Sequence, residues 1–459
     1  MANIFKTIGN GLLILLGARI LDQVLRNNKK DKHCPDPNIT VDRPNSKYIP
    51  NQLVVWKKPG ISDIEFNQWK RHNLQKYSGI LVKKLCRNCD DSLELWEGDN
   101  ISTLISEKAA GSGGSSTSAP PSGGSDAIAC FSYNLIIDLP EPVVCISERY
   151  ERGVKIAGRQ ELKDPAVIVA VFDTGLISDI KGTYTDVVDS CMRGGSSGWN
   201  FAYKNDVTDD DYPTSHGSAV TKFIIDQEAE YGQQKISILP VKVHNSYGKS
   251  DLFSILCGFA YAARCGAKIV NASFGFYASK DGEAPAILSQ FVKKHLTDNN
   301  ILLVAAAGNV NADESIGRTT AEKIRNLEYH PFFPACLSKD FENVLAVTTI
   351  SREEGKVSPS QNFSNTIVDI GVDCDRVAED DYWFEDPLGR RILIVGSSYA
   401  TPIVTGKIAQ HYQALMDAMP FRVINKSILL QEMKNLGIIK TDDRFNEYII
   451  DGNWSTKGR

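Results

Sequence analysis

The chain has 459 residues, of which 42% are hydrophobic and 23% charged, a composition typical of a globular protein long enough for more than one domain. A formal net charge of -5 and a sequence pI near 5.9 give no electrostatic reason to expect nucleic acid as a partner. Acidic substrates are not implied either, because the sequence has no long basic tract.

Residues 1 to 45 combine an apolar segment with a polar connector. The apolar run from Ile8 to Leu25 is broken by Gly17 and Arg19, so it is too short for the roughly 20 residues that span a bilayer. Gly17-Ala18-Arg19 is a poor signal-peptide cleavage site. The pattern favours a helix that packs on a partner or lies on a membrane surface. We predict cytoplasmic residence, with peripheral membrane contact through this helix as an alternative, and leave a secreted form open.

Residues 46 to 140 have the pattern of a small α+β domain. Ser62 and Glu65 form a helix-capping pattern. Residues 111–125, GSGGSSTSAPPSGGS, have no core-forming side chain and predict a flexible linker. Such a domain could assist the folding of the larger C-terminal part or inhibit it, or it could be a plain interaction domain. The predicted strands are 52–57, 79–83, 92–96 and 133–139, and the predicted helices are 62–74 and 101–110.

Residues 150 to 459 alternate between strand and helix patterns from Pro165 onward. Runs of β-branched residues bounded by helices predict a doubly wound, mainly parallel sheet with helices on both faces. A helical extension is predicted at the C-terminus. The predicted strands are 166–172, 236–243, 267–271, 301–306 and 344–350, and the predicted helices follow His216, span 252–263 and 285–296, and follow Ser398.

The ten cysteines are scattered rather than spaced as a framework. Several lie in apolar strand or helix patterns, which favours buried free thiols in a reducing compartment. Cys86 and Cys89 have the spacing of half a zinc site, but no second pair follows. We therefore predict no metal centre at this position.

The segment Gly396 to Pro402 follows an apolar run and opens a helical pattern, so Ser398 lies where a helix begins. Free backbone N–H groups and the positive end of the helix dipole suit a nucleophile whose attack creates an oxyanion. Pro402 is tolerated near the first turn and fixes the helix start in this neighbourhood. A plain N-cap serine is the alternative.

Three other polar residues could complete a catalytic group. Asp173 ends a buried strand and would face the ligand crevice at the carboxyl edge of a parallel sheet. His216 starts a helix and could act as the base that a serine nucleophile needs. Asn309 follows another buried strand, and its amide could donate to an oxyanion. Each alone also fits a plainer role, a turn for Asp173 and Asn309 and a surface cap for His216. Asn271 to Gly275 fits a turn or an edge that pairs with an extended peptide.

Together these segments resemble the subtilisin-like serine proteases. The resemblance covers about residues 164 to 415, and five motifs in the order of the family make it specific. The motifs are Phe172-Asp173-Thr174-Gly175, His216-Gly217-Ser218, Asn271-Ala272-Ser273-Phe274-Gly275, Ala307-Gly308-Asn309 and Gly396-Ser397-Ser398-Tyr399-Ala400-Thr401-Pro402.

This resemblance implies a serine endopeptidase that works through an acyl-enzyme intermediate on protein or peptide substrates. Ser398 would be the nucleophile, His216 the general base and then acid, and Asp173 the group that orients His216. Asn309 and the N–H of Ser398 would bind the oxyanion. The substrate would meet two short segments, Ser273, Phe274 and Gly275 along its backbone, and Ala305, Ala306 and Ala307 beside the pocket for the residue before the scissile bond.

Residues 48 to 139 resemble, more faintly, the prodomains of this family, which have two helices on a small antiparallel sheet. This implies a zymogen whose N-terminal domain inhibits the enzyme in the same chain, with self-cleavage between Pro140 and Asp164. Calcium is common in the family, but the cluster Asp206, Asp209, Asp210 and Asp211 is interpreted as a solvated acidic loop. We predict that no cofactor or metal is required, and leave calcium open because sequence alone does not certify a site.

The chain departs from the family at two places, and other protein classes fit it less well. Ser397 stands where threonine is usual, and Thr221-Lys222 replaces a small Ala-Gly pair. An aspartic protease would need a second Asp-Thr/Ser-Gly, and an α/β-hydrolase would have glycine where Ala400 stands. A binding module that keeps the fold without the chemistry stays an alternative, although every catalytic position is filled. The sequence does not indicate specificity, activating signal or oligomeric state.

Overall fold

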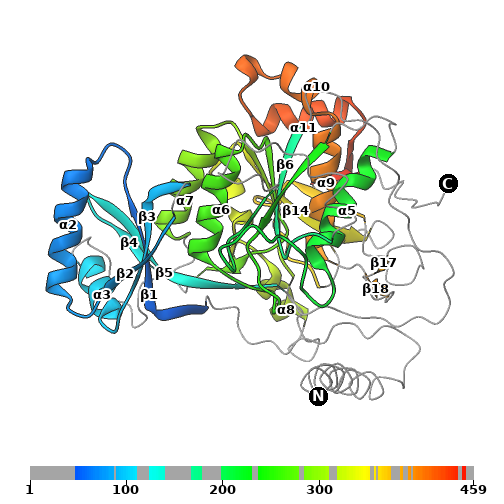
Figure 1. Cartoon of the computed structure of the whole chain (residues 1–459). Helices are drawn as coiled ribbons and strands as arrows, with labels where there is room; N and C mark the ends of the chain where they lie inside the picture. Colours follow the sequence, from blue (N-terminus) through cyan, green and yellow to red (C-terminus); the bar gives the residue numbers. More distant parts are fainter. Residues whose placement is uncertain are drawn as a thin grey trace, which may run out of the picture. The chain divides into compact units, whose positions relative to one another are not determined.

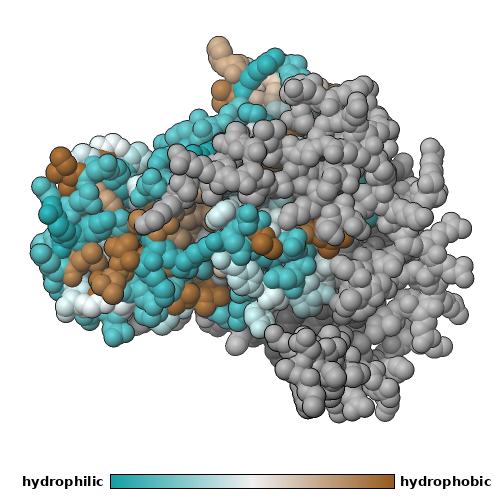
Figure 2. All heavy atoms as spheres, in the orientation of Figure 1, coloured by the Kyte–Doolittle hydropathy of each residue, from teal (hydrophilic) through white to brown (hydrophobic). Residues whose placement is uncertain are grey.

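The computed structural model describes residues 47–86, 89–110, 123–139, 167–177, 198–229, 236–278, 284–309, 318–351, 356–357, 360–373, 383–385, 391–393, 396–442 and 447–450. The predicted N-terminal helix and connector, at residues 1–45, lie outside this range, as does the predicted self-cleavage region. No helix in the described ranges is long and apolar enough to cross a membrane. The face shown in Figure 2 is mostly hydrophilic where it is described, and its hydrophobic side chains form small separate groups.

The first part of the structure is a small antiparallel sheet with two helices (Figure 1). Its strand order is β2-β3-β1-β5-β4, which confirms the predicted α+β domain. The helix α2 has a full capping box between Ser62 and Glu65, and Trp69 packs on Trp96 with ring centroids 5.6 Å apart. The elements are β1 (Lys47–Lys57), α2 (Asp63–Lys76), β2 (Leu81–Cys86), β3 (Asp90–Glu97), α3 (Ile101–Ala110), β4 (Gly123–Ser125) and β5 (Ala129–Asp138).

The predicted linker at 111–125 is too long by three residues. Gly123 to Ser125 form β4, which pairs antiparallel with β5. A glycine pair suits this edge because a Cβ on Gly123 would lie 2.4 Å from the carbonyl oxygen of Phe131. The absence of side chains therefore allows a close backbone contact at Gly123 and Gly124. The rest of the predicted linker, residues 111–122, lies outside the described residues.

The second part is a large, mainly parallel sheet with the order β19-β20-β16-β14-β12-β10-β6-β8-β7. The chain starts at β6 in the interior, adds β8 on one side and β10, β12, β14 and β16 on the other. This reversal beside β6 is a topological switch point, where open α/β sheets bind their ligands. The strands are β6 (Val167–Asp173), β7 (Trp199–Asn200), β8 (Ile236–Lys242), β10 (Ile269–Ala272), β12 (Leu302–Ala306), β14 (Val344–Ser351), β15 (Lys356–Val357), β16 (Ile370–Val372), β19 (Ile439–Asp442) and β20 (Glu447–Ile450).

Helices cover both faces of this sheet, as predicted (Figure 1). On one face α5 and α9 build a core with the inward residues of the strands, and on the other α6 and α7 join a core that continues into the N-terminal sheet. The C-terminal extension, predicted as helical, also adds β19 and β20 to the edge of the sheet. The helices are α5 (His216–Ala229), α6 (Leu252–Arg264), α7 (Ala286–Val292), α8 (Arg318–Arg325), α9 (Ser397–Gln410), α10 (Tyr412–Asp417) and α11 (Lys426–Asn435), with a π-helix η1 (Lys293–Thr297) and 3-10 turns η3 (Ala335–Lys339) and η4 (Pro420–Arg422). Two further antiparallel pairs are β11 (Phe276–Tyr277) with β13 (Phe332–Phe333), and β17 (Trp383–Glu385) with β18 (Arg391–Leu393).

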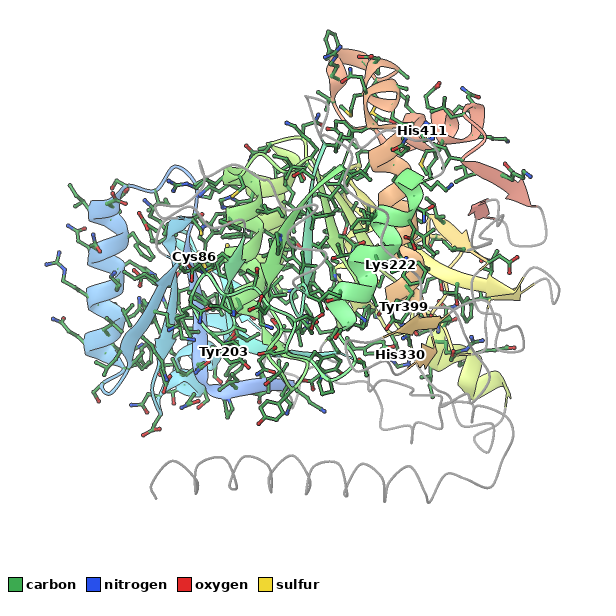
Figure 3. All side chains as sticks on the ribbon, turned by 45° about the vertical axis from the view of Figure 1, so that its right-hand side comes forward. Cys86, Tyr203, Lys222, His330, Tyr399 and His411 are labelled. Atoms are coloured by element: carbon green, nitrogen blue, oxygen red, sulfur yellow. A yellow bond between two sulfur atoms is a disulfide. The ribbon has the colours of Figure 1, made fainter. Side chains whose placement is uncertain are left out.

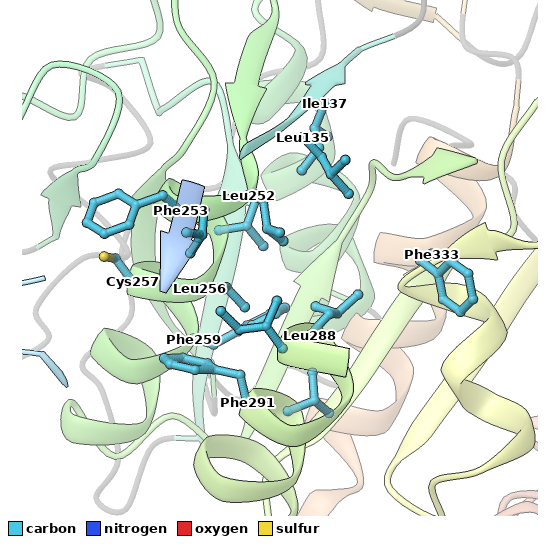
Figure 4. Packing of buried hydrophobic residues seen from close by; sticks show 14 of the residues in the cluster. Leu135, Ile137, Leu252, Phe253, Leu256, Cys257, Phe259, Leu288, Phe291 and Phe333 are labelled. Carbon is cyan, nitrogen blue, oxygen red and sulfur yellow. The ribbon is translucent and has the colours of Figure 1, made fainter. Parts of the chain in front are cut away.

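The N-terminal sheet packs directly on α6 and α7. Leu135 and Ile137 from β5 share a buried cluster with Leu252, Leu256 and other residues of these helices (Figure 4). The sheet also continues into the second part, because β5 pairs antiparallel with β9 (Lys249–Asp251). Burial of this shared apolar surface stabilises the contact between the two parts.

Two cysteines join the two parts of the structure. Cys86 at the end of β2 (Figure 3) and Cys257 on α6 form a disulfide whose Cα atoms are 5.8 Å apart. The prediction of free thiols is therefore wrong for this pair, since residues 171 positions apart leave no local signal of their contact. The prediction holds for Cys130 and Cys336, which are buried and free.

Candidate active site

Asp173 and His216 meet at the carboxyl edge of the sheet. Asp173 is the last residue of β6, and His216 is the first residue of α5. His216 Nδ1 lies 2.8 Å from Oδ1 and 3.0 Å from Oδ2 of Asp173. Both side chains are buried, at 1% and 5% exposure. The carboxylate therefore fixes the ring orientation and leaves Nε2 pointing away from it, as a general base requires.

Burial and charge act in opposite directions on this pair. Burial disfavours the carboxylate of Asp173, but His216 and the N–H of Thr174 hold the pKa of Asp173 below its ordinary value. Burial also disfavours the protonated ring, but the Asp173 carboxylate outweighs it and raises the pKa of His216. A histidine so placed accepts a proton more readily than an isolated one.

Ser398 lies in the first turn of α9, as predicted. The helix begins at Ser397, after Gly396 with a φ of 111°, and Pro402 lies inside the helix rather than in its first turn. The backbone N–H of Ser398 belongs to the turn that has no internal acceptor. The hydroxyl of Ser398 donates to the carbonyl of Ser273 at 3.0 Å.

Ser398 and His216 are close neighbours without a direct hydrogen bond. The ring of Tyr399, beside Ser398 (Figure 3), lies 5.3 Å from the ring of His216, centroid to centroid. His216 Nε2 is buried and has no hydrogen-bond partner among the described residues. To reach Nε2, the hydroxyl of Ser398 has to leave the Ser273 carbonyl, and catalytic hydrogen bonds are often loose before substrate binds.

Asn309 is held with its amide N–H₂ available. Its Oδ1 accepts hydrogen bonds from the N–H and the hydroxyl of Ser397 at 3.2 and 3.0 Å. With Oδ1 occupied, Nδ2 is the end of the amide left to donate. A Cβ on Gly396 would lie 2.8 Å from Nδ2, so glycine is required here both for its φ and for this close approach.

The two predicted substrate segments adjoin the strands β10 and β12. Ser273, Phe274 and Gly275 follow β10 and belong to no strand, and Ser273 contacts Ser398 as described above. Ala305 and Ala306 end β12, and Ala307 follows it, all three fully buried. Their contact with substrate stays a prediction.

Sequence reasoning missed Gln361 and Tyr399 as parts of the site. Gln361 Oε1 accepts from the N–H of Ser397 at 2.8 Å, which helps to orient the start of α9. Tyr399 packs between His216 and Phe223. No pattern in the sequence indicates that Gln361 or Tyr399 packs against the site.

The departure at Thr221-Lys222 does not disturb the packing of α5. Lys222 (Figure 3) pairs with Asp226 at 2.5 Å, four residues later on the same helix. The close approach of α5 and α9 occurs instead at Gly406, where a Cβ would lie 2.5 Å from the carbonyl oxygen of Ile224. In the described ranges no group of three or more His, Cys, Asp or Glu side chains could hold a metal ion, and independence from calcium stays a prediction.

Known proteins are similar to this chain mainly over the second part of the structure. The profile of the subtilase family matches residues 164–444. The cell wall-associated protease of Bacillus subtilis (strain 168) is 34% identical over 137 residues, which are 28% of this chain and 14% of that protein. Subtilisin-like protease 3 of Plasmodium falciparum (isolate 3D7) is 23% identical over 176 residues, 38% of this chain and 21% of that protein. The matches span well under a third of either relative.

Two solved structures are similar over most of the chain. The epidermin leader peptide processing serine protease of Staphylococcus aureus has a TM-score of 0.51 and 15% identity to this chain. The alignment covers 87% of this chain and 96% of that protease's chain. Fervidolysin from Fervidobacterium pennivorans has a TM-score of 0.51 and 14% identity, covering 88% and 65%. At these identities the likeness shows the fold.

Proposed function

The chain belongs to the subtilase family, and from this premise we propose that it is a serine endopeptidase that hydrolyses proteins or peptides through an acyl-enzyme intermediate. The observation that carries the proposal is the contact of His216 Nδ1 with both carboxylate oxygens of Asp173, 2.8 and 3.0 Å away, beside a serine at a helix start. A buried acid that holds a histidine near a serine is the arrangement in which the histidine can act as the base of a serine nucleophile.

In each half of the proposed reaction, His216 acts first as a base and then as an acid. His216 Nε2 takes the proton of Ser398 as its oxygen attacks the substrate carbonyl, and the imidazolium is stabilised by Asp173. Nδ2 of Asn309 and the N–H of Ser398 donate to the oxyanion. His216 then protonates the leaving amine, and water repeats the sequence to release the acid. No step requires a metal ion or cofactor.

A fluorophosphonate probe tests this proposal. The probe reacts with an activated serine, and peptide mapping is expected to find it on Ser398. The reaction is to be tried with the full chain and with a fragment that lacks residues 1 to 140. Folded protein that is unlabelled in both forms would contradict the proposal and favour a binding module.

The pH dependence of kcat/KM is expected to follow His216. Only the neutral ring can accept the proton of Ser398, and the pKa of His216 is raised above its ordinary value, near 6.5, by Asp173. Activity should therefore fall tenfold per pH unit on the acid side, beginning above pH 6.5. A profile on a peptide substrate whose own groups do not titrate checks this, and full activity at pH 5.5 would refute the assignment.

Asn309→Ala is expected to lower kcat by about 10²- to 10³-fold with little change in KM, because the lost donor acts on the oxyanion of the transition state. Ser397→Ala is the comparison, since it removes a hydrogen bond to Oδ1 and leaves the donor in place, so a smaller loss is expected. Steady-state kinetics on an amide substrate measure kcat and KM for both variants. Equal losses in the two variants would remove Asn309 from the oxyanion site.

We also propose that the N-terminal domain inhibits the site in the same chain. The last described residue of this domain, Leu139, donates its N–H to the carbonyl of Gly248 at 2.8 Å. A Cβ on Gly248 would meet both Leu139 and Tyr212, and Tyr212 is four residues before His216. Leu139, the first residue after β5, thus lies near the segment that leads to His216, and Asp173, His216 and Ser398 are all buried.

The contact between the domains is polar as well as apolar, which supports a specific docking. Asp90 on β3 accepts hydrogen bonds from Lys294 at 2.9 Å and His295 at 2.8 Å, both on the π-helix, and from Trp56 Nε1 at 3.1 Å. Burial opposes the charge, but the hydrogen bonds from His295, Ser92 and Lys294 hold the pKa of Asp90 well below its ordinary range. A second polar contact is made by Asn134 Oδ1, which accepts the N–H of Phe253 at 3.1 Å in the first turn of α6.

A further inference from the structure

The acidic loop before α5 contributes one carboxylate that joins the segments carrying Asp173 and His216. Asp210 Oδ1 accepts a hydrogen bond from the hydroxyl of Thr174 at 2.8 Å. Its Oδ2 accepts from the N–H and the hydroxyl of Ser218, at 2.9 and 2.7 Å. Thr174 follows Asp173, and Ser218 lies two residues after His216. We call Thr174, Asp210 and Ser218 the clasp.

The other atoms of the clasp are also satisfied. The hydroxyl of Thr174 accepts the N–H of Gly217 at 2.9 Å, and the hydroxyl of Ser218 accepts the N–H of Ile177 at 3.0 Å. Thr174 and Ser218 are fully buried. A Cβ on Gly217 would lie 2.4 Å from the carbonyl oxygen of Gly175, so the two segments touch through their backbones and the clasp holds them there.

We propose that Asp210 is a positioning residue for the protease reaction: the clasp fixes the end of β6 against the start of α5 and so keeps Asp173 within hydrogen-bond distance of His216. The inference rests on the proposed function. A carboxylate suits the place because its four donors, two from Ser218 and one each from Thr174 and the N–H of Tyr212, need two accepting oxygens. An amide offers one, and a charged acceptor forms the stronger bonds.

Asp210 also acts on His216 through its charge. The titratable and charged groups around it are Asp173 on β6, His216 on α5, Tyr399 on α9, and its neighbour Asp211 with the ion-pair partner Lys242 of β8. Burial raises the pKa of Asp210 to about 6, the charge of Asp173 adds to the rise, and the bonds from Ser218 and Thr174 oppose it. The ionised Asp210 adds to the effect of Asp173 in raising the pKa of His216.

Asp210→Asn tests the clasp with little change in shape. The amide places an N–H₂ against donors, so the clasp opens, and misplacement of the base is expected to lower kcat roughly ten- to a hundredfold with KM nearly unchanged. The acid limb of the pH profile should move to lower pH, because the charge that raises the pKa of His216 is gone. Asp206→Asn, at an exposed aspartate of the same loop, is the matched control. It should leave kcat and the acid limb of the pH profile as in the wild type.

A second pair of variants covers the case in which Asp210→Asn does not fold. Thr174→Val removes the hydroxyl that joins Asp210 to Gly217 and should lower kcat, while Thr174→Ser keeps the hydroxyl and should restore it. A purely structural role would alter thermal unfolding without moving the pH profile. Wild-type values of kcat and of the acid limb in Asp210→Asn would overturn the proposal, as would equal kcat in the two Thr174 variants.

NMR titration of the histidine rings separates this inference from the proposed function. The titration is done in a Ser398→Ala background, because the NMR measurement does not depend on activity. There the ring of His216 should titrate at lower pH in Asp210→Asn than in Asp206→Asn. If the wild type neither hydrolyses peptides nor reacts with a fluorophosphonate, the protease proposal fails while this shift still tests the clasp. An unchanged His216 titration in an active enzyme overturns the clasp alone.

Discussion

Ser398→Ala is expected to reduce kcat for peptide hydrolysis by on the order of 10⁶-fold, because the hydroxyl that forms the acyl-enzyme is lost. The remaining rate should reflect the oxyanion donors and substrate binding alone. KM is expected to change little, since the backbone contacts at Ser273 to Gly275 are untouched. The measurement is steady-state hydrolysis of a peptide ester and an amide, with burst kinetics on the ester to detect the acyl-enzyme.

The control for this substitution is Ser246→Ala. Ser246 lies on the surface, and its hydroxyl contacts Tyr203, so its loss should leave kcat unchanged. Ser398→Ala removes a hydrogen bond to the Ser273 carbonyl, and the free energy of unfolding is expected to change by about 1 kcal/mol. Hydrolysis by Ser398→Ala at the wild-type rate, with the fold intact, would exclude Ser398 as the nucleophile.

The sequence predicted the central parts of the site because local patterns mark them. Asp173 ends a run of apolar β-branched residues, and Ser398 stands between such a run and a helical pattern, so a parallel sheet brings both to one edge. The structure adds that Asp173 and His216 are in contact. It also corrects a detail, since Pro402 lies inside α9 and the helix start is set by Gly396.

The residues that hold the site in place could not be predicted in the same way. Gln361 reaches Ser397 across 36 positions, and Asp210 reaches Thr174 across the same separation. Polar side chains in loops have no periodicity, so only the folded chain shows which donors surround them. In the sequence Asp210 is one of four aspartates that indicate a solvated acidic loop, whereas its carboxylate is fully occupied by the clasp.

Pairing between distant segments limited the prediction of the fold for the same reason. The strand β9 is three residues long and polar throughout. Its pairing with β5 therefore follows from the packing of the N-terminal sheet on α6 and α7, and its own sequence does not indicate it. The predicted helix at 285–296 is divided into α7 and the π-helix η1. Such π segments often occur at functional sites, and this one carries both Lys294 and His295, which donate hydrogen bonds to Asp90.

Asp90→Asn is expected to raise the activity of the full-length enzyme on a small peptide by roughly tenfold. The substitution keeps the shape of the side chain but leaves Lys294 and His295 without their anion in a buried contact. Breaking one partner of a buried pair costs several kcal/mol, and since Lys294 is about one-third exposed, we discount this to about 1–2 kcal/mol. That is about tenfold in the balance between docked and undocked domain.

The neighbouring Asp91 supplies the matched control, because it is exposed and Asp91→Asn removes the same charge without touching the π-helix. Its activity should equal that of the wild type. A fragment beginning near Glu141 sets the upper limit of activity once the N-terminal domain is absent. The disulfide between Cys86 and Cys257 would still tether the undocked domain, so each comparison is run with and without reductant. Inhibition by the N-terminal domain is refuted if the fragment and the full chain hydrolyse the peptide equally fast under both conditions.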